Sequence, residues 1–124
     1  MVSPQLRILV VENHQLFALG LELLLTQLGH KVLEVVATGE EAILRAERHR
    51  PDFVVMDVGL DGEMDGVEAA KEIRSRFGIR SLFLTGISDP NTRQQADLAE
   101  PIGFLDKGTS KADLARIISQ ITPE

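Results

Sequence analysis

Five short, mostly apolar segments alternate with five segments of helical periodicity along this chain. The apolar segments are Leu6 to Val11, Lys31 to Ala37, Phe53 to Met56, Ser81 to Leu84 and Ile102 to Leu105. Between them, apolar residues recur at the spacing of about 3.6 residues that places them on one face of a helix. Strands that are apolar along most of their length are typical of a parallel sheet with helices on both faces. Because crossovers between parallel strands are right-handed, the simplest prediction is a doubly wound α/β fold of the (βα)5 type.

The helical segments carry start and stop signals. Three pairs of residues have the spacing of a capping box at a helix N-terminus, namely Thr38 with Glu41, Asp65 with Glu68 and Ser110 with Asp113. Gly29 and Gly78 follow the first and third helical segments, and glycine is common just after a helix. Asp89 and Pro90 have the pattern of an N-cap and a first helical residue, although the helix predicted after them is weakly apolar.

Length and composition limit the class of protein. A chain of 124 residues, 44% of them hydrophobic, is long enough for one domain with its own core, and no second domain is expected. The absence of cysteine excludes disulfides and Cys-ligated metals. No apolar stretch approaches the roughly 20 residues that span a bilayer, and no signal-peptide pattern is present, so we expect a cytoplasmic protein without membrane contact. The net charge of -6 argues against direct binding of nucleic acid.

Four of the apolar segments end in polar residues whose chemistry suits phosphoryl transfer. These residues are Glu12 with Asn13, then Asp57, Thr85 and Lys107. The carboxyl ends of parallel strands meet at one edge of the sheet, where open α/β folds place their ligand sites. A carboxylate attacks phosphorus only if the charge that builds up on the transferred oxygens is neutralised, which requires a cation and hydrogen-bond donors nearby. The sequence therefore predicts one pocket that holds a nucleophile, a hydroxyl, an ammonium group and a metal-binding corner.

The order and placement of these residues resemble the receiver domain of two-component response regulators, over essentially the whole chain (1–124, a single domain). The resemblance implies a flavodoxin-like fold with a parallel sheet of strand order 2-1-3-4-5. It implies that Asp57 is the phosphoacceptor, that Thr85 bonds a phosphoryl oxygen and that Lys107 is the conserved cation of the family. Phe104 matches the aromatic position that moves with Thr85 and so changes a protein-binding surface near the last strand and the last two helices.

The same resemblance implies a cofactor and partners. Mg2+ would be bound by Glu12, Asn13, Asp57 and the backbone carbonyl of Gly59, and the phosphoryl donor would be a histidine kinase or a phosphotransfer protein. Such a domain is a signalling protein rather than an enzyme, since it catalyses only its own phosphorylation and dephosphorylation. The output protein is unknown. The family commonly dimerises through the last two helices, so a homodimer is one expected assembly, and the chain is expected to be a stand-alone receiver or a fragment of a longer regulator.

The sequence departs from the family pattern at three places. Asn13 stands where the family usually has an aspartate that binds Mg2+, and the loss of one charge predicts weaker Mg2+ binding. Asn13 also precedes the first helix, where asparagine is a favourable N-cap, so capping is an equally good interpretation. Gly108 replaces a proline that is joined to the lysine by a cis peptide bond in the family, so the Lys107 to Gly108 bond is either cis and strained or trans. Asp61 stands where proline is frequent.

Two other functions stay open. One is a receiver fold that works as a protein-interaction module without phosphorylation. The other is a nucleotide- or flavin-binding protein or a small phosphatase, against which the absence of GxGxxG, GxxxxGKS and DxD motifs argues. The histidines at positions 14, 30 and 49 have no metal-ligand spacing and are predicted to be surface or capping residues.

Overall fold

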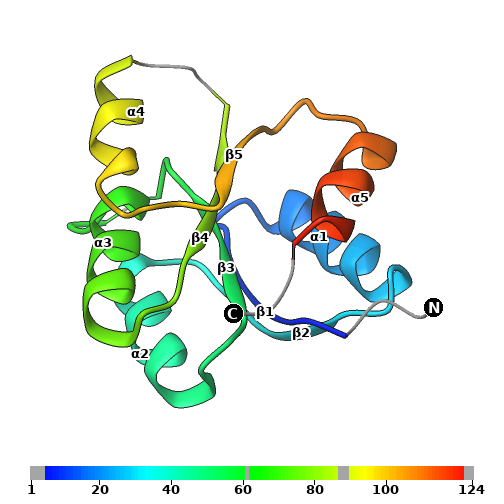
Figure 1. The fold of residues 1–124 in the computed structure, drawn as a ribbon, viewed down its shortest axis with the longest axis horizontal. Coiled ribbons are helices and arrows are strands. Elements are labelled where there is room, and N and C mark those ends of the chain that lie inside the picture. The colour runs from blue at the N-terminus through cyan, green and yellow to red at the C-terminus, as the bar shows by residue number, and fades with distance from the viewer. Residues whose placement is uncertain (1–4, 61, 87–89, 122–124) are drawn as a thin grey trace.

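A computed structural model describes residues 5–60, 62–86 and 90–121. Strands and helices alternate along the chain from the first described strand to the last helix (Figure 1). The strands are β1 (Arg7–Val11), β2 (Lys31–Val36), β3 (Phe53–Asp57), β4 (Ser81–Thr85) and β5 (Gly103–Asp106). The helices are α1 (Gln15–Gln27), α2 (Gly39–His49), α3 (Gly66–Phe77), α4 (Pro90–Asp97) and α5 (Lys111–Ser119). The predicted positions of Asp61 and of the N-cap Asp89 lie outside the described residues.

The five strands form one parallel sheet in the order β2-β1-β3-β4-β5. This is the predicted 2-1-3-4-5 order, and the doubly wound fold is confirmed. Helices α1 and α5 cover one face of the sheet, and α2, α3 and α4 cover the other (Figure 1). Successive residues of a strand point to opposite faces of the sheet. In the fully buried strand β3, Val54 and Met56 therefore enter one core cluster, while Phe53 and Val55 enter the other.

The predicted helix caps are present. The side chains of Thr38, Asp65 and Ser110 each accept a hydrogen bond from the backbone N–H three residues later, at 3.1, 2.9 and 3.1 Å. Gly78 ends α3 with φ of 73°, a left-handed conformation that favours glycine. These local interactions satisfy N–H groups that a helix leaves unpaired at its start, which is why the spacing alone predicted them.

The strand ends differ slightly from the prediction. β3 and β4 each continue one residue further, so that Asp57 and Thr85 are the last residues of their strands rather than the first residues of the following loops. Both still belong to the parallel ladder, in which Asp57 is opposite Leu84 and Thr85 is opposite Asp106. The sheet therefore fixes the backbone of both residues.

Helix α4 is the least firmly packed helix. It has eight residues, of which only Ala96 is buried, and the exposed fraction of Leu98 just beyond it is 67%. Polar contacts with α3 supplement this small apolar contact, including a hydrogen bond of 3.2 Å from Lys71 to Gln95. In the described part of the chain no helix is long and apolar enough to cross a membrane.

Candidate functional site

The carboxyl edge of the sheet holds an open cleft of about 860 Å³. Asp57 reaches it from the end of β3, Thr85 from the end of β4 and Lys107 from the turn after β5. The full lining is Asn13, His14, Phe17, Asp57, Val58, Gly59, Thr85, Gly86, Thr92 and Lys107. With the exceptions of Glu12 and Phe104, all the site residues predicted from the sequence therefore border one space.

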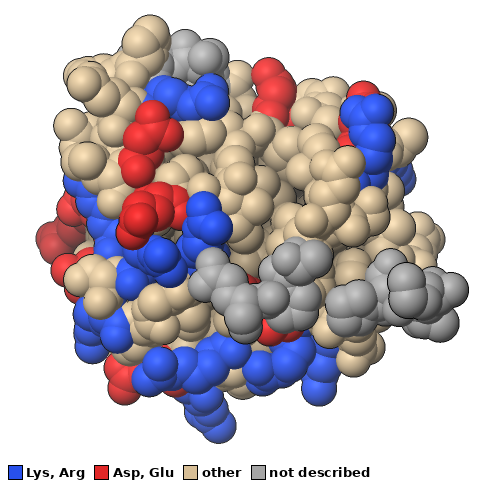
Figure 2. Space-filling model, in the orientation of Figure 1, with Lys and Arg blue, Asp and Glu red and all other residues tan. Residues whose placement is uncertain are grey.

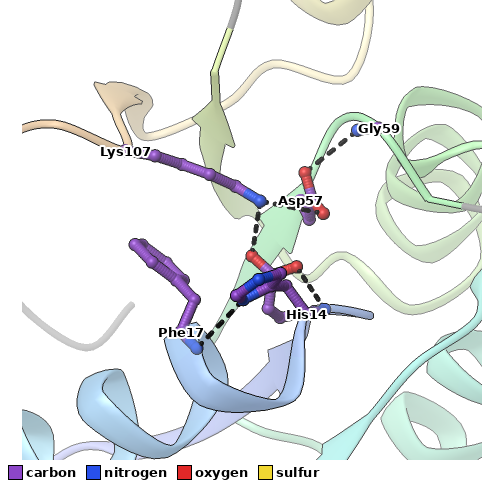
Figure 3. Close-up of polar contacts among 6 residues, drawn as sticks. His14, Phe17, Asp57, Gly59 and Lys107 are labelled. Carbon is purple, nitrogen blue, oxygen red and sulfur yellow. Dashed lines mark hydrogen bonds and ion pairs between the residues drawn. The ribbon is translucent and has the colours of Figure 1, made fainter.

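Lys107 joins the two buried carboxylates of the site (Figure 3). Its Nζ lies 2.7 Å from Oε1 of Glu12 and 3.2 Å from Oδ2 of Asp57. The Glu12 and Asp57 residues are only 2% and 3% exposed, whereas the Lys107 side chain is 26% exposed. Two negative charges thus share one positive charge, and both carboxylate residues are almost fully buried.

Burial and charge together shift the pKa values of Glu12 and Lys107. Burial raises the pKa of Glu12 above its usual value, the ion pair with Lys107 opposes that change, and the neighbouring Asp57 adds to it. For Lys107, burial would lower the pKa, but the contacts with Glu12 and Asp57 outweigh it and the pKa is raised. Glu12 therefore carries a charge that its surroundings only partly compensate, and Lys107 is held in its charged form.

Hydrogen bonds to the residue before α1 and to β2 hold Glu12 in place. Oε2 of Glu12 accepts a hydrogen bond of 2.9 Å from the backbone N–H of His14, and the N–H of Glu12 donates to the Val36 carbonyl at 2.9 Å. His14 is the N-cap of α1, since its Nδ1 accepts the N–H of Phe17 at 3.3 Å. The interpretation of Asn13 as the N-cap is therefore wrong, because the helix begins one residue later than that role requires.

The three histidines have separate environments. His14 caps α1, as described above, and His49 lies 2.6 Å from Glu34 on the partly exposed surface. His30 is buried, contrary to the prediction of a surface or capping residue. Its Nδ1 accepts the N–H of Leu6 at 3.1 Å, and burial lowers its pKa. This hydrogen bond joins segments that lie 24 residues apart, so no local pattern could have predicted it.

The backbone around Asp57 is held by two glycines. The N–H of Gly59 donates to Oδ1 of Asp57 at 3.0 Å, so this glycine contacts the carboxylate directly. Gly66, the first residue of α3, approaches still more closely, because a Cβ at this position would lie only 2.0 Å from the Asp57 carbonyl oxygen. The sequence reasoning did not single out Gly66. Its only signal was a glycine directly after the capping residue Asp65.

Thr85 and Phe104 lie on neighbouring strands but face different surroundings. Thr85 borders the cleft, whereas the half-buried ring of Phe104 stacks on the buried ring of Phe83 with 5.4 Å between centroids. The guanidinium of Arg93 in α4 lies 3.8 Å from the centroid of the Phe104 ring. Phe104 on β5 thus contacts β4 through Phe83 and α4 through Arg93.

In the turn after β5, Lys107 is followed by Gly108 instead of the proline that is common in the family. No peptide bond between described residues is cis, so the Lys107 to Gly108 bond is trans. The Lys107 N–H donates to the Thr85 carbonyl at 3.0 Å, and the Gly108 N–H donates to Oδ1 of Asp106 at 2.7 Å. The ammonium group also lies 5.1 Å from the centroid of the Phe17 ring, another cleft residue that the sequence reasoning missed (Figure 3).

The donor set at this edge fits a hard divalent cation. Mg2+ prefers carboxylate and carbonyl oxygens, and Glu12 and Asp57 offer buried carboxylates beside the amide of Asn13. Apart from Lys107, no described residue donates a hydrogen bond to Oε1 of Glu12. No group of three or more His, Asp or Glu side chains suited to a metal gathers anywhere in the described ranges, in keeping with an amide at position 13. The site thus offers two carboxylates whose charge Lys107 does not balance.

Comparison with known proteins identifies relatives of the whole domain. A family model described as the response regulator receiver domain matches residues 8–119. The transcriptional regulatory protein PdtaR of Mycobacterium tuberculosis is 33% identical over 108 residues, covering 87% of this chain and 52% of PdtaR. The phyllosphere-induced regulator PhyR of Methylorubrum extorquens is 30% identical over 114 residues, covering 91% of this chain and 42% of PhyR. The chain thus spans about half the length of these curated relatives.

Solved structures of similar fold lead to the same family. The signal receiver domain of a modulated diguanylate cyclase from Desulfovibrio desulfuricans superposes with a TM-score of 0.86 and 36% identity, over 93% of this chain and 91% of that one. The receiver domain of the sensor histidine kinase PA1611 from Pseudomonas aeruginosa, whose active-site cleft holds a coordinated magnesium ion, gives a TM-score of 0.82 and 31% identity over 94% and 97% of the two chains. With the fold, the family match and the strand-end cleft in agreement, the chain belongs to the response regulator receiver domains of two-component signalling.

Proposed function

We propose that this receiver accepts a phosphoryl group on Asp57 from a phosphohistidine donor, with Mg2+ as the cofactor. The observation that carries the proposal is the position of the Asp57 carboxylate. It is buried at the end of β3 yet borders an open cleft, and it is held by the Lys107 ammonium at 3.2 Å and the Gly59 N–H at 3.0 Å. A carboxylate fixed in this way is oriented for in-line attack on a phosphorus centre that enters the cleft.

The transfer step is a displacement at phosphorus. One carboxylate oxygen of Asp57 forms a bond to phosphorus as the bond from phosphorus to the donor's histidine nitrogen breaks, and the electron pair stays on that nitrogen. Lys107, already beside the carboxylate, would follow the developing charge onto a phosphoryl oxygen. A Mg2+ ion held by Glu12, Asp57, Asn13 and the Gly59 carbonyl would supply further positive charge to those oxygens.

The output of the modification would pass through Thr85 and Phe104. Thr85 borders the same cleft as Asp57, next to the space that a phosphoryl group on Asp57 would enter. Because Phe104 lies beside Phe83 on the neighbouring strand and beneath Arg93 of α4, a shift of the β4 end would change the surface formed by α4 and β5. A protein that reads this surface would be the partner of the phosphorylated domain.

Phosphorylation of Asp57 is the first prediction. Incubation with Mg2+ and acetyl phosphate, and separately with a panel of phosphorylated histidine kinases, is expected to add one phosphoryl group to the wild-type chain. Intact-mass spectrometry and an acyl-phosphate stain would detect it. The Asp57→Ala variant should stay unmodified, whereas the Asp97→Ala variant, which changes an exposed carboxylate at the end of α4 outside the cleft lining, should still be modified.

The alternative is an interaction module that works without phosphorylation, and the same experiment separates the two. A folded wild-type chain that takes no phosphoryl group from any donor at saturating Mg2+ would support the interaction module and reject phosphoryl transfer.

A further inference from the structure

The turn that carries Lys107 contains a glycine. Residues 107–110 connect β5 to α5, and Gly108 directly follows the lysine. Glycine has more conformational freedom than any other residue, so the turn needs further contacts to give Lys107 one direction. That direction is defined, because Nζ lies 2.7 Å from Oε1 of Glu12 and 3.2 Å from Oδ2 of Asp57 (Figure 3). Contacts within the turn must therefore restrain its backbone.

Asp106, the last residue of β5, restrains the turn twice. Its Oδ1 accepts the N–H of Gly108 at 2.7 Å, and its backbone carbonyl accepts the N–H of Thr109 at 2.9 Å. The first contact forms an Asx turn, and its short distance is typical of a charged acceptor. Asp106 is itself opposite Thr85 in the parallel ladder, and the Lys107 N–H donates to the Thr85 carbonyl at 3.0 Å. The turn is thus anchored to a residue whose backbone the sheet fixes.

Gly108 and the Asp106 carboxylate are matched in size. A Cβ at position 108 would lie only 3.2 Å from Oδ1 of Asp106, which is tighter than a usual contact between such atoms. A larger residue would therefore push the carboxylate away from the N–H that it accepts. Glycine permits the short hydrogen bond, and the hydrogen bond removes the freedom that glycine brings to the turn.

Asp106 lies outside the cleft that Asp57 borders. It is exposed and does not line the cleft, whereas Lys107 does. Among the described residues, the ion-pair partners of Lys107 are Glu12 and Asp57. Asp106 is therefore connected to the groups in the cleft through the backbone that carries Lys107.

We propose that Asp106 is a positioning residue, whose carboxylate fixes the turn that directs the Lys107 ammonium group to Glu12 and Asp57. The kinetic consequence rests on the proposed phosphorylation of Asp57, in which Lys107 would neutralise charge on the transferred oxygens. Misplacing a group in a reacting site by about 1 Å can slow a reaction on the order of a hundredfold. Because other contacts still hold Lys107, loss of the Asp106 hydrogen bond should slow phosphorylation by roughly threefold to tenfold.

Two substitutions of Asp106 separate the hydrogen bond from the charge. Asp106→Ala removes both, whereas Asp106→Asn removes the charge and keeps an oxygen that can accept the Gly108 N–H. The distinction matters because few other charged side chains appear in Figure 2 over the surface between the end of β5 and α5, whereas Lys and Arg gather along the lower edge of the molecule. Phosphorylation by acetyl phosphate should be slowed in Asp106→Ala and retain most of the wild-type rate in Asp106→Asn.

Asp52→Ala is the matched control. The Asp52 carboxylate also accepts a backbone N–H at 2.7 Å, from Arg7, and the substitution changes the charge by the same amount. Asp52 directly precedes β3, at the edge of the sheet opposite the cleft. This variant should be phosphorylated like the wild type, and thermal unfolding of all variants would show that they are folded.

The NMR signals of the Lys107 side chain test the positioning role without phosphorylation. The Lys107→Met variant assigns these signals, and the exposed Lys111 provides the reference for a solvated lysine. In Asp106→Ala the Lys107 signals should move toward those of Lys111, and in Asp106→Asn they should stay close to the wild type. A wild-type chain that takes no phosphoryl group would reject the proposed function, whereas the NMR comparison would still decide whether Asp106 positions Lys107.

A second background tests the hydrogen bond itself. Gly108→Pro removes the N–H that Asp106 accepts, so adding Asp106→Ala to it should change neither the rate nor the Lys107 signals further. Unmoved Lys107 signals in Asp106→Ala would overturn the proposal, whatever the rate. Equal effects of Asp106→Ala and Asp106→Asn would assign the change to charge and would also overturn it, as would a full effect of Asp106→Ala in the Gly108→Pro background.

Discussion

At the scale of single residues, Lys107 decides the electrostatics of the site. It is the only described cation within ion-pair distance of the buried carboxylates of Glu12 and Asp57. Removing one member of a buried ion pair usually costs about 3–5 kcal/mol, because the remaining charge stays desolvated. The Lys107 side chain is 26% exposed, so we expect Lys107→Met to lower the free energy of unfolding by a smaller amount, about 2–3 kcal/mol.

The pH dependence of that variant has a defined sign. Burial already raises the pKa of Glu12, and loss of Lys107 would raise it further. At pH values between the pKa of Glu12 in the unfolded chain and its higher pKa in the folded chain, the folded state binds more protons than the unfolded state. The free energy of unfolding therefore falls as the pH rises through this interval. Urea unfolding from pH 5 to pH 8 should show a steeper decline for Lys107→Met than for the wild type or for Lys111→Met, the control at an exposed lysine. Parallel curves for all three would show that Lys107 does not hold the Glu12 carboxylate in its charged form.

At the scale of elements, the contact between the start of α3 and the end of β3 positions Asp57, the proposed phosphoacceptor. A methyl group at Gly66 would lie 2.0 Å from the carbonyl oxygen of Asp57 and 3.1 Å from the Cα of Val58. Backbone atoms cannot give way as a flexible side chain does, so either α3 or the Asp57 backbone must move. The orientation of the carboxylate therefore depends on a glycine nine residues further along the chain.

We accordingly expect Gly66→Ala to be destabilising by about 1–3 kcal/mol, as overpacked sites usually are, and to slow phosphorylation by acetyl phosphate. Gly20→Ala is the matched control in a helix, because nothing lies within 4 Å of a Cβ at that position. It should be neutral or stabilising by about 0.5–1 kcal/mol through the helix preference of alanine over glycine. Thermal unfolding and phosphorylation rates for the two variants would refute the positioning role if Gly66→Ala behaved like Gly20→Ala.

At the scale of the whole molecule, the proposed Mg2+ site at the sheet edge would link metal binding to global stability. A ligand that binds only the folded chain stabilises it, by about 2.7 kcal/mol at one hundred times the dissociation constant. Since the excess negative charge of Glu12 and Asp57 is buried, Mg2+ should raise the melting temperature of the intact domain more than NaCl at equal ionic strength does. Asn13→Asp should melt lower than the wild type without Mg2+, because it adds a like charge, and should bind Mg2+ more tightly. Unchanged Mg2+ affinity in this variant would show that position 13 does not face the metal.

Local patterns in the sequence were enough to predict the element order, the parallel doubly wound sheet and the N-caps at Thr38, Asp65 and Ser110, because these depend on periodicity and on contacts three or four residues apart. The sequence also placed Asp57, Thr85 and Lys107 at strand ends, and parallel strands bring such ends to one edge. How those ends meet follows from contacts between residues far apart in the chain. Lys107 lies 50 residues from Asp57 along the chain, and its contact with Glu12 depends on the strand order and the shape of the turn at Gly108.

The tertiary structure also decided which surfaces are covered. His14 rather than Asn13 caps α1, because the path of the chain after β1 sets where the helix begins. The periodicity of α1 marks Leu21 and Leu25 as core, but the leucine content of the helix does not reveal which residues stay exposed. That depends on where α5 packs, and α5 lies more than eighty residues further along the chain. Local patterns thus specify elements, while distances between chemical groups and the exposure of apolar faces depend on contacts between residues far apart in the sequence.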